Sequence, residues 1–289
     1  MIPDIHADLE RLEATLSRTP ETGNLLFLGD LIDAGTLVAS PDDKAVLRRV
    51  RQLVEEGRAR CVMGNHELNA ILYHTDGPEG PLRQHSPKNA TQHRSFISAF
   101  GTGTREAREW TDWLLSLPLW LQVAGLCLLH ACWDEDAVET VRARRPDARL
   151  KRSDLAEVAN ECTEFGRAVK RLLNGPEVRL PSGYSFEDFG GHTRQNVRLA
   201  WWRSNARNWR EAALSVPDVT QLPDARLPPT ERADLYPQGA LPVLVGHYKM
   251  DGAPCIEAPN AACLDYPLSP CAYRWSGEPN LFSDGIIKV

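Results

Sequence analysis

The stretch from Leu25 to Gly35 constrains the fold of this chain more than any other. It begins with the apolar run Leu25-Leu-Phe-Leu28, stops at Gly29, and continues with two carboxylates, Asp30 and Asp33. Such a run is typical of a strand buried on both faces, and the glycine lets the chain turn sharply as it leaves the sheet. In an open α/β sheet, ligands bind at the carboxyl ends of the strands. The two aspartates therefore mark a candidate site.

The same order of apolar run, polar loop and helix recurs along the chain. The run at 60–63 breaks at Gly64-Asn65-His66-Glu67, and the run at 241–245 stops at Gly246-His247. Apolar periodicity predicts helices over 8–18, 41–56, 105–117 and directly after residue 65. This alternation predicts an α/β protein.

The first loop of this pattern, which carries Asp4 and His6, lacks a strand of ordinary length before it. Only three residues precede Asp4, and one of them, Pro3, cannot donate to a sheet ladder. We expect the true start of the protein to lie upstream; the alternative is that the strand has been lost.

The rest of the chain divides into sheet-forming ends and a weakly patterned middle. Residues 119–130 predict a hairpin around Ala124-Gly125, and its second strand ends on His130. Residues 262–266 and 271–275 are expected to form an antiparallel pair, and 285–289 a final strand. Residues 134–240 are charged, rich in arginine and punctuated by proline, with one predicted helix over 155–173. We interpret 134–240 as a cap inserted in a single domain of residues 1–289.

Composition excludes several classes of function. The chain has 289 residues with 33 basic and 39 acidic side chains, and the net charge of -6 argues against a broad surface for a nucleic acid polymer. Seven cysteines without a CxxC pair argue against a structural zinc site. Neither an N-terminal apolar leader nor an apolar run of membrane length is present, so we expect a cytoplasmic protein without a membrane partner.

The polar residues that follow the apolar strands share one chemistry, that of a metal site. They are Asp4, His6, Asp30, Asp33, Asn65, His66, His130 and His247. Carboxylate, imidazole and amide groups without thiolate suit manganese, iron, zinc or nickel. Because they exceed the needs of one ion, we expect two ions, roughly 3.5 to 4 Å apart and bridged by a carboxylate.

In their order along the chain, these residues resemble the motifs of the calcineurin-like metallophosphoesterases. The blocks are D-x-H at 4–6, G-D-x-x-D at 29–33, G-N-H-E at 64–67, the strand-end His130, and G-H at 246–247. The resemblance is closest to the branch that holds the serine/threonine phosphoprotein phosphatases and the bacterial symmetrical diadenosine tetraphosphatases. It implies a four-layer α/β/β/α sandwich of two mixed sheets.

The resemblance also implies a role for each block. Asp4 and His6 would bind the first metal, Asp30 would bridge both, and the second would be completed by Asn65, His130 and His247. A metal-bound hydroxide would attack phosphorus, with manganese the expected ion. His66, held by Asp33, would protonate the leaving group, and Asn65 would also contact the substrate.

Departures from the family pattern narrow the range of substrates that we expect. Phosphoprotein phosphatases carry an arginine where this chain has Ala34, and members with G-H-x-H carry a second histidine where it has Lys249. Without that arginine fork, a phosphorylated small molecule or nucleotide is favoured over a phosphopeptide. Arg194 and Arg198 are candidate replacements in substrate binding; the alternative is a solvated basic surface, with the neighbouring tryptophans only packing.

Two other functions remain open on the sequence. One is a serine/threonine protein phosphatase, and the other is a non-catalytic, metal-binding regulatory relative. His192 is rejected as the fifth-block histidine because no apolar strand precedes it. His74, His85 and His93 are interpreted as surface histidines.

Overall fold

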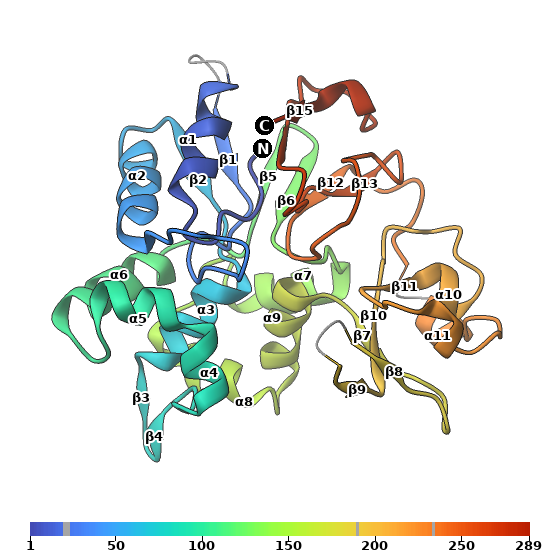
Figure 1. The fold of residues 1–289 in the computed structure, drawn as a ribbon, viewed down its shortest axis with the longest axis horizontal. Coiled ribbons are helices and arrows are strands. Elements are labelled where there is room, and N and C mark those ends of the chain that lie inside the picture. The colour runs from blue at the N-terminus through green and yellow to red at the C-terminus, as the bar shows by residue number, and fades with distance from the viewer. Residues whose placement is uncertain (20–23, 189–190, 233–234) are drawn as a thin grey trace.

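The computed structural model describes residues 1–289 apart from 20–23, 189–190 and 233–234 (Figure 1). Strand β1 (Leu25–Phe27) pairs in parallel with β2 (Ala59–Cys61). On the other side of β1, Ile2 forms a parallel bridge to Phe27, and its N–H donates to the carbonyl of Leu26 at 2.8 Å. Ile2 therefore occupies the place of a strand that the sequence pattern did not supply.

The last strands of the chain form a separate two-stranded sheet that contacts the N-terminal segment. The carbonyl of Met1 accepts the N–H of Tyr273 at 2.9 Å. Tyr273 belongs to β14 (Cys271–Tyr273), which pairs antiparallel with β15 (Ile286–Lys288). Both ends of the chain consequently lie together at one edge of the molecule (Figure 1). The predicted final strand at 285–289 is confirmed.

A second sheet has the order β13-β12-β6-β5. Its strands are β5 (Trp120–Val123), β6 (Leu126–Leu129), β12 (Val243–Val245) and β13 (Ala261–Cys263). Strand β12 pairs in parallel with β6 and β13, whereas β5 and β6 form the predicted antiparallel hairpin. At its turn, Ala124 and Gly125 both have positive φ, 47° and 89°, which a tight two-residue hairpin requires.

The two sheets share an apolar cluster. Leu28 follows β1, and it packs with Leu128 of β6 and Leu244 of β12, all with 0% exposure. Burying a leucine completely stabilises the fold by about 1.5–3 kcal/mol. This packing fixes the carboxyl ends of β1, β2, β6 and β12 relative to one another, and those ends carry the predicted site.

Helices lie beside the first sheet (Figure 1). The Asp8 side chain accepts the N–H of Arg11 and so caps α1 (Leu9–Ser17). Figure 1 shows α1 and α2 beside the β1–β2 pair. The other elements of this half are α2 (Asp43–Glu55), α3 (Asn65–Tyr73), β3 (Asp76–Gly77), β4 (Gly80–Pro81), α4 (Pro87–Gln92), α5 (Arg94–Phe100) and α6 (Arg105–Leu115).

The segment 134–240 contributes to two apolar clusters. Val138, Val141 and Leu172, from α7 (Glu135–Arg144) and α9 (Glu164–Asn174), lie in the main core. Trp209 lies in a smaller cluster with Val197 and Leu222. The remaining elements here are α8 (Leu155–Asn160), β7 (Glu177–Arg179), β8 (Phe186–Glu187), β9 (Thr193–Arg194), β10 (Asn196–Leu199), α10 (Trp209–Ala212), β11 (Ala213–Leu214) and α11 (Pro229–Arg232). Single turns of 3₁₀ helix occur at Arg152–Asp154, Val219–Gln221 and, outside this segment, Ser283–Gly285.

Two predictions about individual elements are wrong. The single helix over 155–173 is two helices, because Glu161 takes a left-handed conformation (φ 55°) and the Thr163 side chain caps α9 afresh. Residues 262–266 and 271–275 do not form a pair with each other. Strand β13 pairs with β12, and β14 pairs with β15, so their ladders lie in different sheets.

Candidate metal centre

The loops that carry the predicted residues have unusual backbone conformations. Of ten non-glycine residues with positive φ in the described part of the chain, six lie in these loops. They are His6, Ala7, Asp30, Asp33, His247 and Lys249. Such conformations cost of order 1–3 kcal/mol each and persist only where the surrounding structure holds them, most often at functional sites.

One group of side chains converges around Asn65. Its Oδ1 lies 2.8 Å from Nε2 of His130 and 2.9 Å from Nδ1 of His247. The two ring nitrogens are 3.2 Å apart, and Nε2 of His130 is 3.3 Å from Oδ1 of Asp30. The Nδ1 of His130 is 2.8 Å from the carbonyl of Leu28 and donates to it, so in the neutral ring Nε2 presents a lone pair to the group. A cation placed among these atoms would satisfy lone pairs that otherwise face each other.

A second group lies on the other side of Asp30. The Nε2 of His6 is 3.8 Å from Oδ2 of Asp4 and 3.9 Å from Oδ2 of Asp30. The Nδ1 of His6 lies 3.2 Å from the carbonyl of Ile32, which again directs Nε2 into the group. One oxygen of Asp30 thus faces each group. His66 shares the second group, since its Nε2 is also 3.9 Å from Oδ2 of Asp30.

The electrostatics of this region favour a cation. Burial, and next to it the charge of Asp265, raise the pKa of Asp4 well above its usual value. Burial alone would lower the pKa of His130, but Asp30 and Asp4 outweigh it and raise the pKa to about 10. The carboxylates therefore stabilise positive charge at this point. A donor set of carboxylate, imidazole and amide fits divalent ions of the manganese and zinc type.

A chain of hydrogen bonds lies behind His66. Its Nδ1 is 2.9 Å from Oδ2 of Asp33. Burial would lower the pKa of His66, but the carboxylates of Asp30 and Asp33 raise it to about 9. The Nδ1 of His93 is 2.7 Å from Oδ1 of Asp33, and the N–H of Asp33 donates to Asp43 at 3.0 Å. Asp33 is therefore held on three sides.

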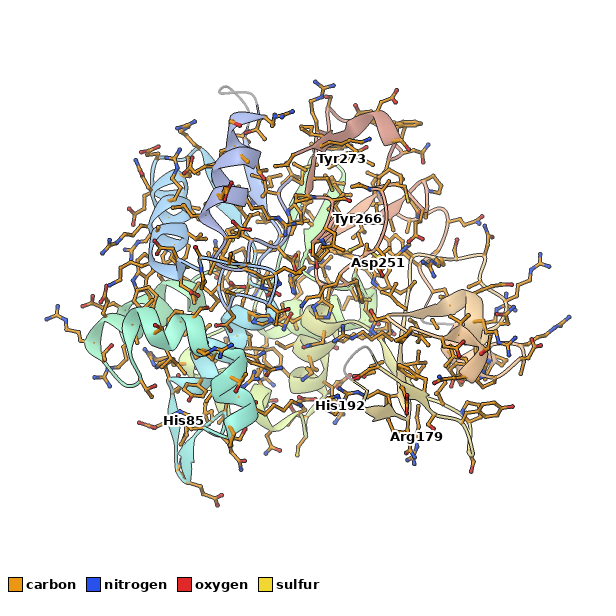
Figure 2. The ribbon with its side chains drawn as sticks, in the orientation of Figure 1. His85, Arg179, His192, Asp251, Tyr266 and Tyr273 are labelled. Carbon is orange, nitrogen blue, oxygen red and sulfur yellow. The ribbon has the colours of Figure 1, made fainter. Side chains whose placement is uncertain are left out.

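The interpretation of His93 as a surface histidine is wrong. It is 4% exposed, and its Nε2 lies 3.1 Å from Nε2 of the half-buried His74. His85, which is labelled in Figure 2, is exposed, as predicted. Its ring stacks on that of Tyr73. His93 follows no strand and belongs to no motif spacing, so the sequence carries no signal for its position beside Asp33.

Two features brace the loops themselves. Glu67 accepts the N–H groups of Gly64, Asp30 and Leu31, each at 2.8 Å. Gly64 leaves no room for a side chain, because a Cβ there would collide with Asp30 and with the carboxylate of Glu67. At the other block, a Cβ on Gly246 would collide with the carboxylate of Asp4, which accepts the N–H of His247 at 3.1 Å. Both glycines are thus required for close approach of the loops.

The two candidate arginines have different positions. Arg198 lines a cavity of about 460 Å³ together with Asn65, and forms no hydrogen bond or ion pair with any described side chain. Arg194 does not line this cavity; it is paired with Asp188 at 2.6 Å, and its side chain is 51% exposed. Trp201 and Trp202 are 1% exposed and pack in the core, and the indole of Trp201 donates to the carbonyl of Ala131.

Ala34 and Lys249, which stand where relatives carry an arginine and a histidine, both form backbone hydrogen bonds. The N–H of Ala34 donates to Ser95, and the N–H of Lys249 donates to Asp265 at 3.0 Å. His192, which is labelled in Figure 2, lies beside the β8–β9 pair, outside both groups around Asp30. Its Nδ1 lies 3.3 Å from Oδ1 of Asp188. Asp265 itself was missed, although it directly follows the apolar run 262–264, whereas Asp30 is separated from its run by Gly29.

The fold is that of a metallophosphoesterase. The family model for the calcineurin-like phosphoesterases matches residues 1–251 of this chain, and the chain belongs to that family. The predicted family is therefore confirmed, and family membership implies a hydrolase that uses divalent metal ions.

Individual relatives match less of the chain. A symmetrical bis(5'-nucleosyl)-tetraphosphatase of Ralstonia nicotianae is 39% identical over 70 residues, which are 24% of this chain and 23% of the relative. The chain thus aligns with less than a quarter of the length of that relative. Among solved structures, a putative diadenosine tetraphosphatase is similar at 17% identity and a TM-score of 0.45, covering 100% of this chain and 90% of that one. A cold-active protein tyrosine phosphatase gives 14% identity and a TM-score of 0.48, covering 92% and 68%.

Within the described residues, no helix combines the length and the apolar character needed to cross a membrane.

Proposed function

We propose that this chain is a dinuclear-metal-dependent phosphoesterase that hydrolyses phosphomonoester or phosphoanhydride bonds of nucleotide-type or small-molecule substrates. The observation that carries the proposal is the position of Asp30, with one carboxylate oxygen toward His6 and the other toward His130. A carboxylate shared between two clusters of ligand atoms is the arrangement that a pair of ions requires.

The residues that would hold the ions follow from these two groups. Asp4, His6 and Asp30 would bind one ion, and Asp30, Asn65, His130 and His247 the other. Two divalent ions, manganese or alternatively iron, zinc or nickel, supply Lewis acidity that activates water and neutralises charge on the phosphoryl oxygens.

The chain's own residues would do the rest of the chemistry. With a pKa of about 9, His66 is protonated at neutral pH, and Asp33 fixes its ring by holding Nδ1. Its Nε2 proton would pass to the leaving-group oxygen, which is general acid catalysis. Asn65 and Arg198 would bind the non-bridging phosphoryl oxygens. Arg194 would first have to exchange its ion pair with Asp188.

The proposed substrate class rests on Ala34 and on the similarity to a tetraphosphatase. Ala34 offers no guanidinium for a phosphopeptide, and its N–H is already bound to Ser95. The similar Ralstonia protein is named for a dinucleoside substrate. We further propose one domain over 1–289, built as a four-layer sandwich with residues 134–240 inserted as a cap, and a cytoplasmic location.

The test uses protein stripped of metal and reloaded separately with manganese, iron, zinc or nickel. Substrates are p-nitrophenyl phosphate, mononucleotides, dinucleoside polyphosphates and phosphopeptides. We expect metal-dependent turnover of the first three, lost in Asp30→Asn and retained in the exposed control Asp284→Asn. Turnover of phosphopeptides alone would favour a protein phosphatase. Metal binding without turnover of any substrate would favour a non-catalytic relative.

A further inference from the structure

Arg83 occupies a position between the candidate catalytic residues and the large cavity. It lines a small cavity of about 50 Å³ together with Asp33, His66 and His93. It also lines the cavity of about 460 Å³ that contains Asn65 and Arg198. A single guanidinium therefore borders both the candidate leaving-group acid and the open space beyond it.

The Arg83 side chain is held in place by α4. Its Nη2 donates to Oδ1 of Asn89 at 3.1 Å and to Oε1 of Gln92 at 2.7 Å. These partners are neutral amides, so they orient the guanidinium without neutralising it. Burial lowers the pKa of Arg83, and the charge of Asp33 opposes that shift, which places the guanidinium in the field of the carboxylate that holds His66.

The large cavity has an excess of positive charge and a mostly polar lining with a few apolar side chains. Among its lining residues, Lys170 is paired with Glu161 at 3.0 Å. Arg83, Lys88 and Arg198 form no ion pair with any described residue, which leaves three cationic groups around the cavity. Leu68, Leu72 and Val158 form part of its wall. Guanidinium and ammonium groups suit a phosphate chain, and the few apolar side chains offer a planar base a limited surface for packing.

We propose that Arg83 binds a second phosphate on the leaving-group side, so that the large cavity accepts a nucleoside phosphate as the leaving group. This inference rests on the proposed function and narrows its substrate class to phosphoanhydrides. Water oxygen forms the new bond to phosphorus and loses its proton to solvent. The bridging P–O bond breaks, and the bridging oxygen leaves with the nucleoside phosphate after taking the Nε2 proton of His66.

A comparison of two substrates tests this role. ADP has a leaving group that carries a phosphate, whereas p-nitrophenyl phosphate does not. Because a hydrogen bond to a charged group is involved, Arg83→Gln should lower the ratio of kcat/KM for ADP to that for p-nitrophenyl phosphate roughly 10- to 100-fold. Arg83→Lys, which keeps the charge and loses the fork, should give an intermediate ratio. The matched control Arg274→Gln, at an exposed arginine after β14, should leave the ratio unchanged.

A binding measurement separates this inference from the proposed function. Calorimetric titration of metal-free protein with ADP does not depend on turnover, and Arg83→Gln should weaken ADP binding at least 10-fold while the melting temperature stays within the range of Arg274→Gln. If Arg83→Gln unfolds, Arg83→Lys carries the comparison. Wild-type protein that binds no ADP, equal ADP binding by the variants, or an unchanged substrate ratio would overturn the role of Arg83. Absence of turnover with unimpaired, Arg83-dependent ADP binding would instead refute the proposed function.

Discussion

The Nδ1 of His93 lies 2.7 Å from Oδ1 of Asp33, while the other oxygen of that carboxylate lies 2.9 Å from Nδ1 of His66. One buried carboxylate thus orients two imidazoles. His93 touches no candidate ligand, yet it determines the direction in which Asp33 can hold His66. We therefore expect His93 to act as a positioning residue.

Substitution of His93 by phenylalanine tests that role. The ring of Phe can keep the stacking on Phe96, which His93 makes at 4.6 Å between centroids, but it cannot donate to Asp33. Loss of one hydrogen bond to a charged group should lower kcat by about 10-fold with a smaller change in KM. His93→Asn, whose amide can replace Nδ1 as a donor, should recover part of kcat. Equal kcat in wild type and His93→Phe would show that Asp33 needs no second partner.

Adding a methyl group at Gly64 should disturb the candidate metal site although no candidate ligand residue is itself replaced. The Cβ would collide with the carboxylates of both Asp30 and Glu67 as well as backbone. We expect Gly64→Ala to lower the free energy of unfolding by about 1–3 kcal/mol, typical of overpacking, and to weaken metal binding. Gly239→Ala is the matched control, because no atom lies within 4 Å of the added Cβ. Chemical denaturation and metal titration measure both effects, and similar behaviour of the two variants would contradict the prediction.

Asp43 gives a pH dependence of stability. Burial raises its pKa from 3.8 to about 6, against the opposing hydrogen bonds from the Asp33 N–H and from Ser95. The folded protein therefore holds this proton more tightly than the unfolded chain. Below about pH 4 the protonated Asp43 does not lower the free energy of unfolding. As the pH rises towards 6, its ionisation lowers the free energy of unfolding, and above about pH 6 this loss is complete.

Asp43→Asn removes that cost. At about 1.4 kcal/mol per pKa unit, the free energy of unfolding of the variant relative to wild type should rise by up to roughly 3 kcal/mol between about pH 4 and pH 7. Urea unfolding at both pH values measures the difference. A relative stability that stays constant with pH would mean that Asp43 is not the group responsible.

Removal of metal should destabilise the protein, because the two groups of side chains around Asp30 come together only in the folded state. An ion at 100 times its dissociation constant stabilises a protein by about 2.7 kcal/mol. We expect EDTA to lower the melting temperature by several degrees, manganese to restore it, and Asp30→Asn to abolish the response. A melting temperature indifferent to both reagents would argue against a metal site here.

Asp30, Asn65, His130 and His247 could be grouped from the sequence because each lies at the end of a short apolar run, and the structure brings these four side chains together. Asp4 and His6 lack such a run before them. The same reasoning would have found Asp265, which follows Ala262-Cys-Leu264. The family resemblance, rather than spacing, supplied the division of roles between Asp30 and Asp33.

His93 and Arg83 could not be predicted in this way. Both belong to the segment after α3. This segment contains a hairpin of two-residue strands and two short helices, and its sequence lacks a strong periodic pattern. Their positions depend on how that segment packs back against α3, which is a tertiary property. The predicted pairing of the segments that form β13 and β14 was wrong because consecutive strands need not be neighbours in a sheet: β13 pairs with β12, and β14 with β15.

The hydrogen bonds between Met1 and Tyr273 span a sequence separation of 272 residues. They anchor the segment that leads into Asp4 and His6, while His247 binds Asp4 across 243 residues. During synthesis, the segment around Asp4 can therefore find neither partner until residues 247 and 273 have left the ribosome. The candidate site should consequently reach its full affinity for metal only after that point.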